Sequence, residues 1–168
     1  MDEKMEIREL KMQDSKDVEG MMLKIFSVEP WNDDWSDREQ LRQYVQELMG
    51  NRNSLSFGLY EDGGLIGISL GRIKHWCEGT EYWIDEFGIL PAKQGAGMGS
   101  AFLAGIERCL TERRIFEIVL LTDRDVPAYW FYRKNGFGEI AGNVFFAKKI
   151  ADRGEKEVFD NTIRRGVT

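Results

Sequence analysis

The fold of this chain is decided by one stretch, Phe87-Gly88-Ile89-Leu90-Pro91-Ala92-Lys93-Gln94-Gly95-Ala96-Gly97-Met98-Gly99-Ser100. It begins as an apolar strand that ends at the proline, and it continues as a turn rich in glycine. Residues 102–110 then carry apolar side chains at helical spacing. The first N–H groups of a helix lack partners within the helix, and glycines let a pyrophosphate approach the backbone closely. The stretch therefore predicts an anion site, although a tight turn that binds nothing shows the same pattern.

Hydrophobic periodicity on both sides of this stretch predicts the remaining elements. Helices are expected at 14–26 and 36–50, where Ser36 and Glu39 form a capping box, and a short helix begins at Pro127. Strands are expected at 6–10, 55–59, 66–70, 81–90, 115–121 and 137–148. The continuously apolar run 115–121 is expected in the centre of the sheet, and 137–148 as a last strand or hairpin. This order predicts an α/β fold with a mixed, mostly antiparallel central sheet flanked by helices.

The composition excludes several classes of protein. The chain has 168 residues, 42% hydrophobic and 31% charged, which fits one globular domain. Its net charge is −6 and no basic run exceeds two residues, so no nucleic acid partner is expected. No apolar run approaches the roughly 20 residues of a membrane helix, and the first residues do not resemble a signal peptide. Two cysteines and one histidine favour the cytoplasm and predict no metal site.

Three motifs resemble those of the GNAT superfamily, the acyl-CoA-dependent N-acyltransferases. Residues 94–99 resemble its Q/R-x-x-G-x-G/A signature, and residues 87–91 resemble its L-x-V-x-P strand end. A third motif, A-x-x-F-Y-x-K-x-G-F, is matched by Ala128-Tyr129-Trp130-Phe131-Tyr132-Arg133-Lys134-Asn135-Gly136-Phe137. The likeness covers roughly residues 6–148. It implies the GNAT fold and an acetyl-CoA-dependent N-acetyltransferase.

The resemblance also implies where acetyl-CoA binds. Amides at the start of the helix would hold the pyrophosphate, and the strand before the turn would pair with the pantetheine arm. The cofactor-binding residues implied are Phe87, Gly88, Ile89, Gln94, Gly95, Ala96, Gly97, Met98, Gly99, Ser100, Asp125 and Lys134. Gly88 fits independently, because a glycine inside a strand often marks a bulge or a close ligand. The family often has asparagine where this chain has Asp125, which cannot donate a hydrogen bond and is instead a candidate helix cap.

The chemistry of acetyl transfer requires a base and an acid. A lysine-like ammonium with a pKa near 10.4 is only about 0.1% neutral around pH 7.4, which costs about 4 kcal/mol. A base or a depressed amine pKa must offset this cost, and the departing thiolate needs a proton. The resemblance assigns the acid to Tyr132, whose phenol near pKa 10 is about 1.5 units weaker than a thiol. A purely structural core tyrosine would show the same pattern.

Glu86 is the candidate base, because many relatives carry a glutamate directly before the strand end. An ordinary glutamate near pKa 4.3 must act through a water or with a raised pKa. Glu81 and Asp85 are rivals. In a regular strand Asp85 points to the face opposite Glu86, so at most one of them enters the site. His75 lies in a loop-like stretch and is expected at the surface.

The acceptor site is predicted between two tryptophan-rich segments. Acidic and aromatic groups together suit a cationic amine, through charge pairing and cation–π contacts. The candidate substrate-binding residues are Trp31, Asp33, Asp34, Trp35, Trp83 and Asp85. Trp76, Glu78, Glu81 and Tyr82 are further candidates for the wall around Trp83. A solvated helix N-terminus is the structural alternative for the first segment, because aspartate is favoured there in any case.

The leading hypothesis is acetyl transfer from acetyl-CoA to a primary amine of a small, cationic molecule, aminoglycoside-like or polyamine-like, in a ternary complex. Transfer to a protein N-terminus or lysine is one alternative, and a CoA-binding regulatory domain without catalysis is another. Residues 1–150 are expected to form the acetyltransferase domain, and 151–168 a charged tail or an extra helix. Many relatives form homodimers, but no apolar stripe in this sequence demands one.

Overall fold

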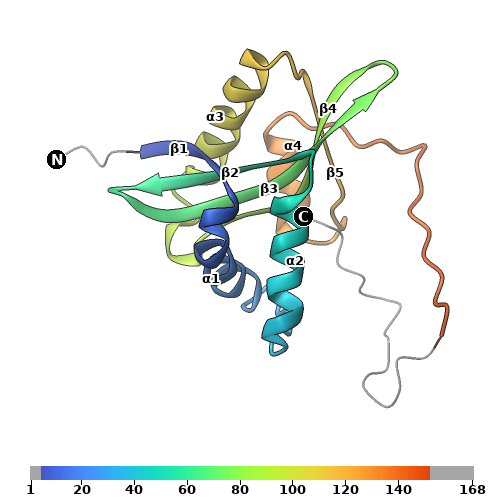
Figure 1. The fold of residues 1–168 in the computed structure, drawn as a ribbon. Helices are drawn as coiled ribbons and strands as arrows, with labels where there is room; N and C mark the ends of the chain where they lie inside the picture. The colour runs from blue at the N-terminus through green and yellow to red at the C-terminus, as the bar shows by residue number, and fades with distance from the viewer. Residues whose placement is uncertain (1–4, 152–168) are drawn as a thin grey trace.

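The computed structural model describes residues 5–151, and its centre is one five-stranded sheet (Figure 1). The strands are β1 (Met5–Leu10), β2 (Ser54–Glu61), β3 (Gly64–Trp76), β4 (Gly79–Ile89) and β5 (Glu117–Leu120). They lie in the order β1-β2-β3-β4-β5, and all neighbours are antiparallel except β4 and β5, which are parallel. The predicted α/β fold with a mixed, mostly antiparallel sheet is confirmed.

Helices cover both faces of this sheet (Figure 1). α1 (Ser15–Phe26) and α2 (Arg38–Gly50) bury Phe26 and Leu41 against Ile68 and Leu70 of β3. On the other face, α3 (Met98–Glu112) and α4 (Pro127–Lys134) pack around Phe87 and Ile89 of β4. Two short 3₁₀ turns, Met12–Asp14 and Pro91–Lys93, precede α1 and the glycine turn. β4 therefore carries side chains into both layers of the molecule.

The start of α2 differs from the prediction by one residue. Asp37, not Ser36, is the N-cap, and its Oδ1 accepts a hydrogen bond from the backbone N–H of Gln40 at 3.0 Å. The backbone N–H of Ser36 instead donates to Oδ1 of Asp34 at 3.0 Å. Both aspartate and serine are good caps, and the carboxylate one residue later is favoured here by the positive end of the helix dipole.

β4 is not a regular strand. Leu70 pairs with Glu86 and the next residue, Gly71, pairs with Ile84, so Asp85 has no direct partner across the ladder. This is a β-bulge, in which two residues on one strand oppose one on its neighbour. The prediction that Asp85 and Glu86 point to opposite faces assumed a regular strand, and the bulge removes that assumption. The bulge places an irregularity in the middle of the sheet, beside both carboxylates.

Two strand predictions are wrong. β5 lies at the edge of the sheet in the described part of the chain, not in its centre, and its residues are only partly buried. A continuously apolar run predicts burial on all sides, but only the inner face of β5 packs against the core. Residues 137–148 form no strand. Glycines at 138 and 142 interrupt this segment, and the consecutive apolar residues 144–146 offer no single face to bury. The predicted charged tail, apart from Ala151, lies outside the described residues.

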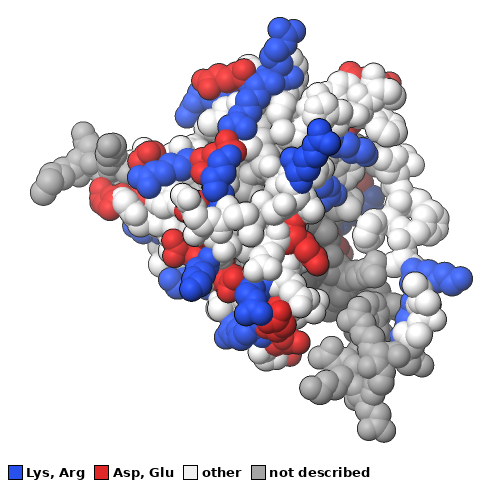
Figure 2. Space-filling model, viewed as in Figure 1, with Lys and Arg blue, Asp and Glu red and all other residues white. Residues whose placement is uncertain are grey.

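The charged side chains are well mixed on the face shown in Figure 2, where Lys and Arg alternate with Asp and Glu. That face carries no continuous basic surface of the kind that binds nucleic acid. Among the described helices, none combines the length and the apolar character needed to cross a membrane.

Candidate active site

Two carboxylates are buried next to each other in the middle of β4. Asp85 is 9% exposed and Glu86 is 6% exposed. Arg72 of β3 forms an ion pair with Asp85. Burial raises the pKa of the Asp85 carboxyl above its usual value, while the hydrogen bond and the charge of Arg72 lower it again in part. The bulge therefore creates a site with two acidic groups, of which one is paired with a cation.

Glu86 is bonded to a residue of the helical layer. The hydroxyl of Tyr44, on α2, donates a hydrogen bond to Oε1 of Glu86 at 2.7 Å. Burial and then the nearby charge of Glu86 raise the pKa of the Tyr44 phenol far above its ordinary value, so the phenol stays protonated. The indole of Trp35 stacks on the Tyr44 ring, with centroids 5.4 Å apart and planes 19° from parallel.

Tyr132 lies in the other layer, against Phe87, the residue that follows Glu86 in β4. It lies on α4, is 3% exposed, and packs its ring 6.4 Å from Phe87 and 5.3 Å from Phe137. Burial first, and the charge of Glu86 second, raise the pKa of its phenol. The predicted acid and the predicted base are thus brought together, with Glu86 close enough to affect the titration of Tyr132.

The glycine turn has the geometry of an anion site. Gly95 and Gly97 have φ of +82° and +78°, a left-handed conformation that favours glycine. Gly97 is the N-cap of α3 and makes no side-chain cap, so the first amides of a helix of 15 residues are not covered by a capping side chain. A Cβ at either glycine would meet nothing within 4 Å. The residues therefore fit a pyrophosphate at the positive end of the helix.

Two predicted cofactor residues have packing contacts that explain them. The side chain of Gln94 donates to the backbone carbonyl of Ile89 at 3.0 Å and ties the turn to the end of β4. A Cβ at Gly99 would lie 3.0 Å from Cε2 of Phe131, so Gly99 lets α3 approach α4 closely. Ala96 is exposed, and Met98 and Ser100 are partly buried at the first turn of α3.

The strand before the turn is held from both sides. Phe87 stacks on Phe102 with centroids 5.4 Å apart, and Ile89 is buried in the same core. A Cβ at Gly88 would lie 2.6 Å from Cγ2 of Ile25, on α1. The close neighbour of Gly88 is therefore a helix, and the bulge at Asp85 lies three residues earlier. Ile25 fills the space beside Gly88, so a ligand could contact this residue only through its backbone.

A chain of contacts links the two predicted acceptor walls. Trp35 reaches Glu86 through Tyr44, as described above. On the next strand, the Arg72 guanidinium that pairs with Asp85 lies 5.7 Å from the Trp83 ring centroid. The Trp83 indole donates to Oε2 of Glu81 at 2.6 Å. The two carboxylates thus lie between the tryptophan of the α1–α2 loop and the tryptophan of β4.

The other predicted acceptor residues are placed less centrally. Trp31 packs against Phe26, with centroids 6.3 Å apart, and Asp33 is partly buried beside it in the loop. Asp34 is exposed and accepts the Ser36 bond described above. These contacts give Trp31 and Asp34 structural roles in the loop between α1 and α2. Tyr82 is wholly buried and hydrogen-bonded to Ser69 at 3.1 Å, so it does not form a wall.

Several other candidates lie outside this cluster. Asp125 and Lys134 are exposed before and at the end of α4. Asp125 is not the helix cap, because Val126 occupies the N-cap and no side chain caps it. His75 is exposed as predicted, but it belongs to β3 and not to a loop. No group of side chains within residues 5–151 could hold a metal ion.

Tyr44 and Arg72 are the residues that sequence reasoning missed. Tyr44 belongs to the apolar pattern that predicts its helix, and nothing in that pattern indicates a bond to a carboxylate. Arg72 follows an alternating strand and carries no motif. Their partners are 42 and 13 residues away, so only the fold brings them to the carboxylates.

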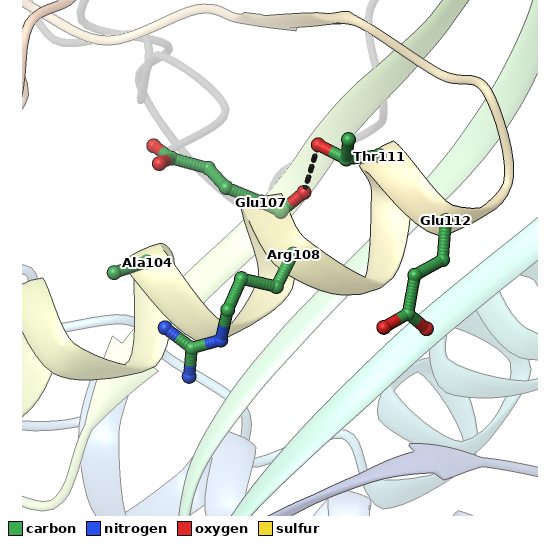
Figure 3. Close-up of a pocket in the computed structure, with 5 residues that line it drawn as sticks. All are labelled: Ala104, Glu107, Arg108, Thr111 and Glu112. Carbon is green, nitrogen blue, oxygen red and sulfur yellow. Dashed lines mark hydrogen bonds between the residues drawn. The ribbon is translucent and has the colours of Figure 1, made fainter.

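A shallow surface depression lies on the second half of α3 (Figure 3). It is lined by Ala104, Glu107, Arg108, Thr111 and Glu112. The hydroxyl of Thr111 donates to the backbone carbonyl of Glu107 at 2.8 Å, which is a bond within the helix. No predicted site residue lines this depression, and it lies at the opposite end of α3 from the glycine turn.

Solved structures with this fold are numerous at low sequence identity. An aminoglycoside acetyltransferase from an uncultured soil metagenomic sample is 16% identical, with a TM-score of 0.67 over 88% of this chain and 99% of that chain. The aminoglycoside N-acetyltransferase AAC(6')-Iy in complex with CoA is 19% identical, with a TM-score of 0.64 over 90% and 98%. A ribosomal-protein-alanine N-acetyltransferase from Brucella melitensis biovar Abortus 2308 is 15% identical, with a TM-score of 0.67 over 87% and 99%.

No curated protein matches the sequence significantly. The family comparison is decisive, because residues 16–137 match the Acetyltransferase (GNAT) family. This range contains β2 to β5, α2 to α4, all of α1 except its first residue, the glycine turn and the two candidate catalytic residues. The chain therefore belongs to the GNAT family and is an acetyl-CoA-dependent acetyltransferase.

Proposed function

We propose that this enzyme acetylates a primary amine of a small molecule by direct attack in a ternary complex, with Glu86 as the base and Tyr132 as the acid. The observation that carries the proposal is the packing of Tyr132, on α4, against Phe87, the residue that follows Glu86 in β4, with ring centroids 6.4 Å apart. The charge of Glu86 also contributes to the raised pKa of Tyr132. Glu86 belongs to the strand that leads into the glycine turn, and Tyr132 lies beside that strand.

The turn and the strand before it would hold acetyl-CoA, which supplies the acetyl group as an activated thioester. The backbone amides of Gly95 to Ser100 would bind the pyrophosphate, and the backbone of residues 87–89 would pair with the pantetheine arm. Gln94 keeps the turn fixed to β4 through its bond to Ile89. Asp125 and Lys134 are exposed, and we place them at the outer part of the cofactor.

Glu86 would remove a proton from the acceptor amine. Its carboxylate is buried and bonded to a neutral phenol, whereas the charge of Asp85 is paired with Arg72. Because Asp85 is held in the ion pair with Arg72, we assign the role of base to Glu86. An ordinary glutamate is too acidic to deprotonate an ammonium directly, so we expect transfer through a water.

Tyr132 would donate a proton to the departing sulfur. The raised pKa keeps its phenol protonated at neutral pH, so the donor is present when the thioester bond breaks. The same shift makes full transfer to a thiolate more uphill than for an ordinary tyrosine. The phenol would therefore first donate a hydrogen bond to the sulfur as negative charge develops there. It would transfer its proton only as the carbon–sulfur bond breaks.

The acceptor would lie between Trp35 and Trp83, with Trp31, Asp33 and Asp34 supporting the first wall. Glu86, Glu81 and the paired Asp85 favour a cationic amine. Arg72 and Lys74 lie against Trp83, at 5.7 and 4.8 Å from its ring centroid, and reduce the acidic excess on that side. This balance supports a small amine with few positive charges over a highly charged polycation.

The test is an acetyl-transfer assay that measures thiol release with acetyl-CoA and a panel of amines. The panel holds an aminoglycoside, a polyamine, simple alkylamines and peptides with a free N-terminal alanine or an internal lysine. We expect transfer to at least one small amine, and a fall of about 10²–10⁴-fold in kcat for Glu86→Gln and for Tyr132→Phe. Equal rates for the wild type and both variants would show that Glu86 and Tyr132 do not act as base and acid. If only the peptides are acetylated, the acceptor is a protein and not a small molecule.

A further inference from the structure

Tyr44 joins the acceptor loop to the candidate base. Its hydroxyl bonds Oε1 of Glu86 at 2.7 Å, and its ring carries the stacked indole of Trp35. We propose that Tyr44 is a positioning residue: it fixes the orientation of the Glu86 carboxylate, holds it in the charged form, and transmits the position of Trp35 to it. The catalytic part of this inference rests on the role of Glu86 proposed above.

The bond has a defined direction and effect. The raised pKa keeps the Tyr44 phenol protonated, so it can only donate to the carboxylate. A hydrogen bond to the charged form of an acid stabilises that form and lowers the pKa of the acid. It also occupies one carboxylate oxygen, which fixes the rotation of the group. Without this bond, a carboxylate that is 6% exposed would be protonated more easily.

Three other groups near Glu86 differ from Tyr44 in charge or in the layer from which they come. Asp85 on β4 is a like charge, and its partner Arg72 on β3 is engaged in the ion pair. Tyr132 on α4 is protonated and comes from the opposite layer. From the α1–α2 layer, the hydroxyl of Tyr44 donates a hydrogen bond to Glu86. Its loss should therefore change the titration of Glu86 specifically.

Stacking, and not a side-chain hydrogen bond, holds the indole of Trp35 in place. Its indole Nε1 is buried and has no hydrogen-bond partner among the described residues. The ring lies nearly parallel to Tyr44 and packs against the core formed by α1, α2 and β3. A ligand that moves Trp35 would thus also move the phenol that holds the base. This arrangement couples occupancy of the acceptor site to the position of Glu86.

The test compares Tyr44→Phe with the wild type in two independent measurements. The first is an NMR titration of the glutamate side-chain carboxyls in the unliganded protein, with the Glu86 signal assigned by its loss in Glu86→Gln. We expect its midpoint to rise by about one pH unit in Tyr44→Phe. The second is the pH profile of kcat/KM, whose acidic limb should move upward by the same amount, with a fall of about 10-fold in kcat and an unchanged KM for acetyl-CoA.

Tyr60→Phe is the matched control. Tyr60 is a partly buried tyrosine on β2, and the charged group over its ring is Arg8, at 4.4 Å from the centroid. Its loss should leave both the Glu86 titration and the pH profile unchanged. Trp35→Ala is the second variant if Tyr44→Phe does not fold. This variant keeps the Tyr44 hydroxyl but removes the ring that stacks on it. We therefore expect the Glu86 midpoint to rise, but by less than in Tyr44→Phe.

The outcomes separate this inference from the proposed function. A Glu86 midpoint in Tyr44→Phe equal to that in Tyr60→Phe overturns the positioning role. If Glu86→Gln keeps full activity while the midpoint shifts, Tyr44 holds Glu86 but Glu86 is not the base, and only the proposed mechanism fails. In the third case Glu86→Gln loses activity and the Glu86 midpoint shifts in Tyr44→Phe, but the pH profile of kcat/KM does not. The proposal that Tyr44 affects catalysis through Glu86 is then wrong.

Discussion

Gly97 has a left-handed backbone at the start of α3, with φ of +78° and open space where a Cβ would be. We predict that Gly97→Val abolishes the thermal stabilisation by acetyl-CoA. The side chain would strain the turn and cover the amides that face the pyrophosphate. The strain alone should cost about 1–2 kcal/mol of unfolding free energy. Thermal melting with and without acetyl-CoA measures both effects.

Gly63 supplies the control for strain. It has φ of +84° in the β2–β3 turn, and a Cβ there would also meet nothing within 4 Å. Gly63→Val should lower the melting temperature of the free protein as much as Gly97→Val does, yet keep the shift caused by acetyl-CoA. If both variants keep that shift, the pyrophosphate does not bind at this turn.

The Arg72–Asp85 pair predicts a pH-dependent loss of stability. Burial raises the pKa of Asp85, and Arg72 holds it down in part, so Arg72→Met should raise it further. A carboxyl whose pKa is higher in the folded than in the unfolded protein destabilises the fold as the pH rises through that range. We expect a loss of about 1–2 kcal/mol at pH 7 that shrinks as the pH falls toward 4. Urea unfolding at both pH values measures it.

Arg8→Met is the control for this pair. Arg8 is a surface arginine that lies over Tyr60 and bonds the exposed Glu6 at 2.8 Å. Its replacement should change the unfolding free energy by less than about 0.5 kcal/mol at either pH. The double variant Arg72→Met/Asp85→Asn should lose the pH dependence of Arg72→Met. A loss that is equal at pH 7 and pH 4 would show that Arg72 acts by packing and not by its charge.

At the level of residues, the sequence predicted the groups that belong to motifs. Tyr132 and Glu86 were named by their place in the motifs, and the structure brings them together, while their catalytic roles stay a proposal. Tyr44 and Arg72 could not be found because their importance lies in partners from other elements. The buried position of both carboxylates depends on a bulge, and a bulge depends on how β4 pairs with β3 rather than on its own residues.

The elements were predicted where hydrophobic periodicity was strong. The two helices of the first layer, β2 and the helix after the turn agree with their expected ranges within a few residues, whereas β3 continues to Trp76, six residues beyond its expected end. The position of β5 in the sheet was predicted wrongly because an apolar run does not show which neighbours a strand has, and β5 is only partly buried. The prediction of a strand at 137–148 was wrong because a strand needs a neighbouring strand to pair with. The sequence of the segment alone does not show whether such a neighbour exists.

The contact between α3 and α4 carries the element-scale prediction. A Cβ at Gly99 would lie 3.0 Å from Cε2 of Phe131, the residue before Tyr132. Gly99→Ala should therefore push α4 away, cost about 1–3 kcal/mol of unfolding free energy, and lower kcat by displacing Tyr132. Phe131→Leu makes room, so the double variant should recover much of both losses. Unfolding curves and steady-state kinetics measure the coupling.

Gly20→Ala is the matched control within α1, where a Cβ would meet nothing within 4 Å. Alanine is the better helix former, so this variant should gain about 0.5–1 kcal/mol of stability and keep its activity. If Gly99→Ala loses acetyl-CoA binding and Phe131→Leu does not restore it, Gly99 serves the ligand and not the packing of the two helices.

At the scale of the whole molecule, the candidate site lies where the two layers meet across β4. α2 supplies Tyr44 from one face, α4 supplies Tyr132 from the other, and the bulge presents Glu86 to both. The order of elements together with the motifs was enough to predict this layered α/β fold. The contacts across the layers were not predictable, because they join segments far apart in the chain.

This arrangement predicts that acetyl-CoA stabilises the whole domain. The cofactor would contact β4, the turn and α3, so it binds the folded chain and not the unfolded one. At about 100 times its dissociation constant it should add about 2.7 kcal/mol to the unfolding free energy. For a domain of this size that corresponds to a rise of roughly 5–11 °C in melting temperature. A short acetyl thioester without the pyrophosphate, such as acetyl-N-acetylcysteamine, is the control and should give no rise. An equal rise with both compounds would mean that binding depends on the thioester end alone, and the assignment of the pyrophosphate to the glycine turn would then have to be given up.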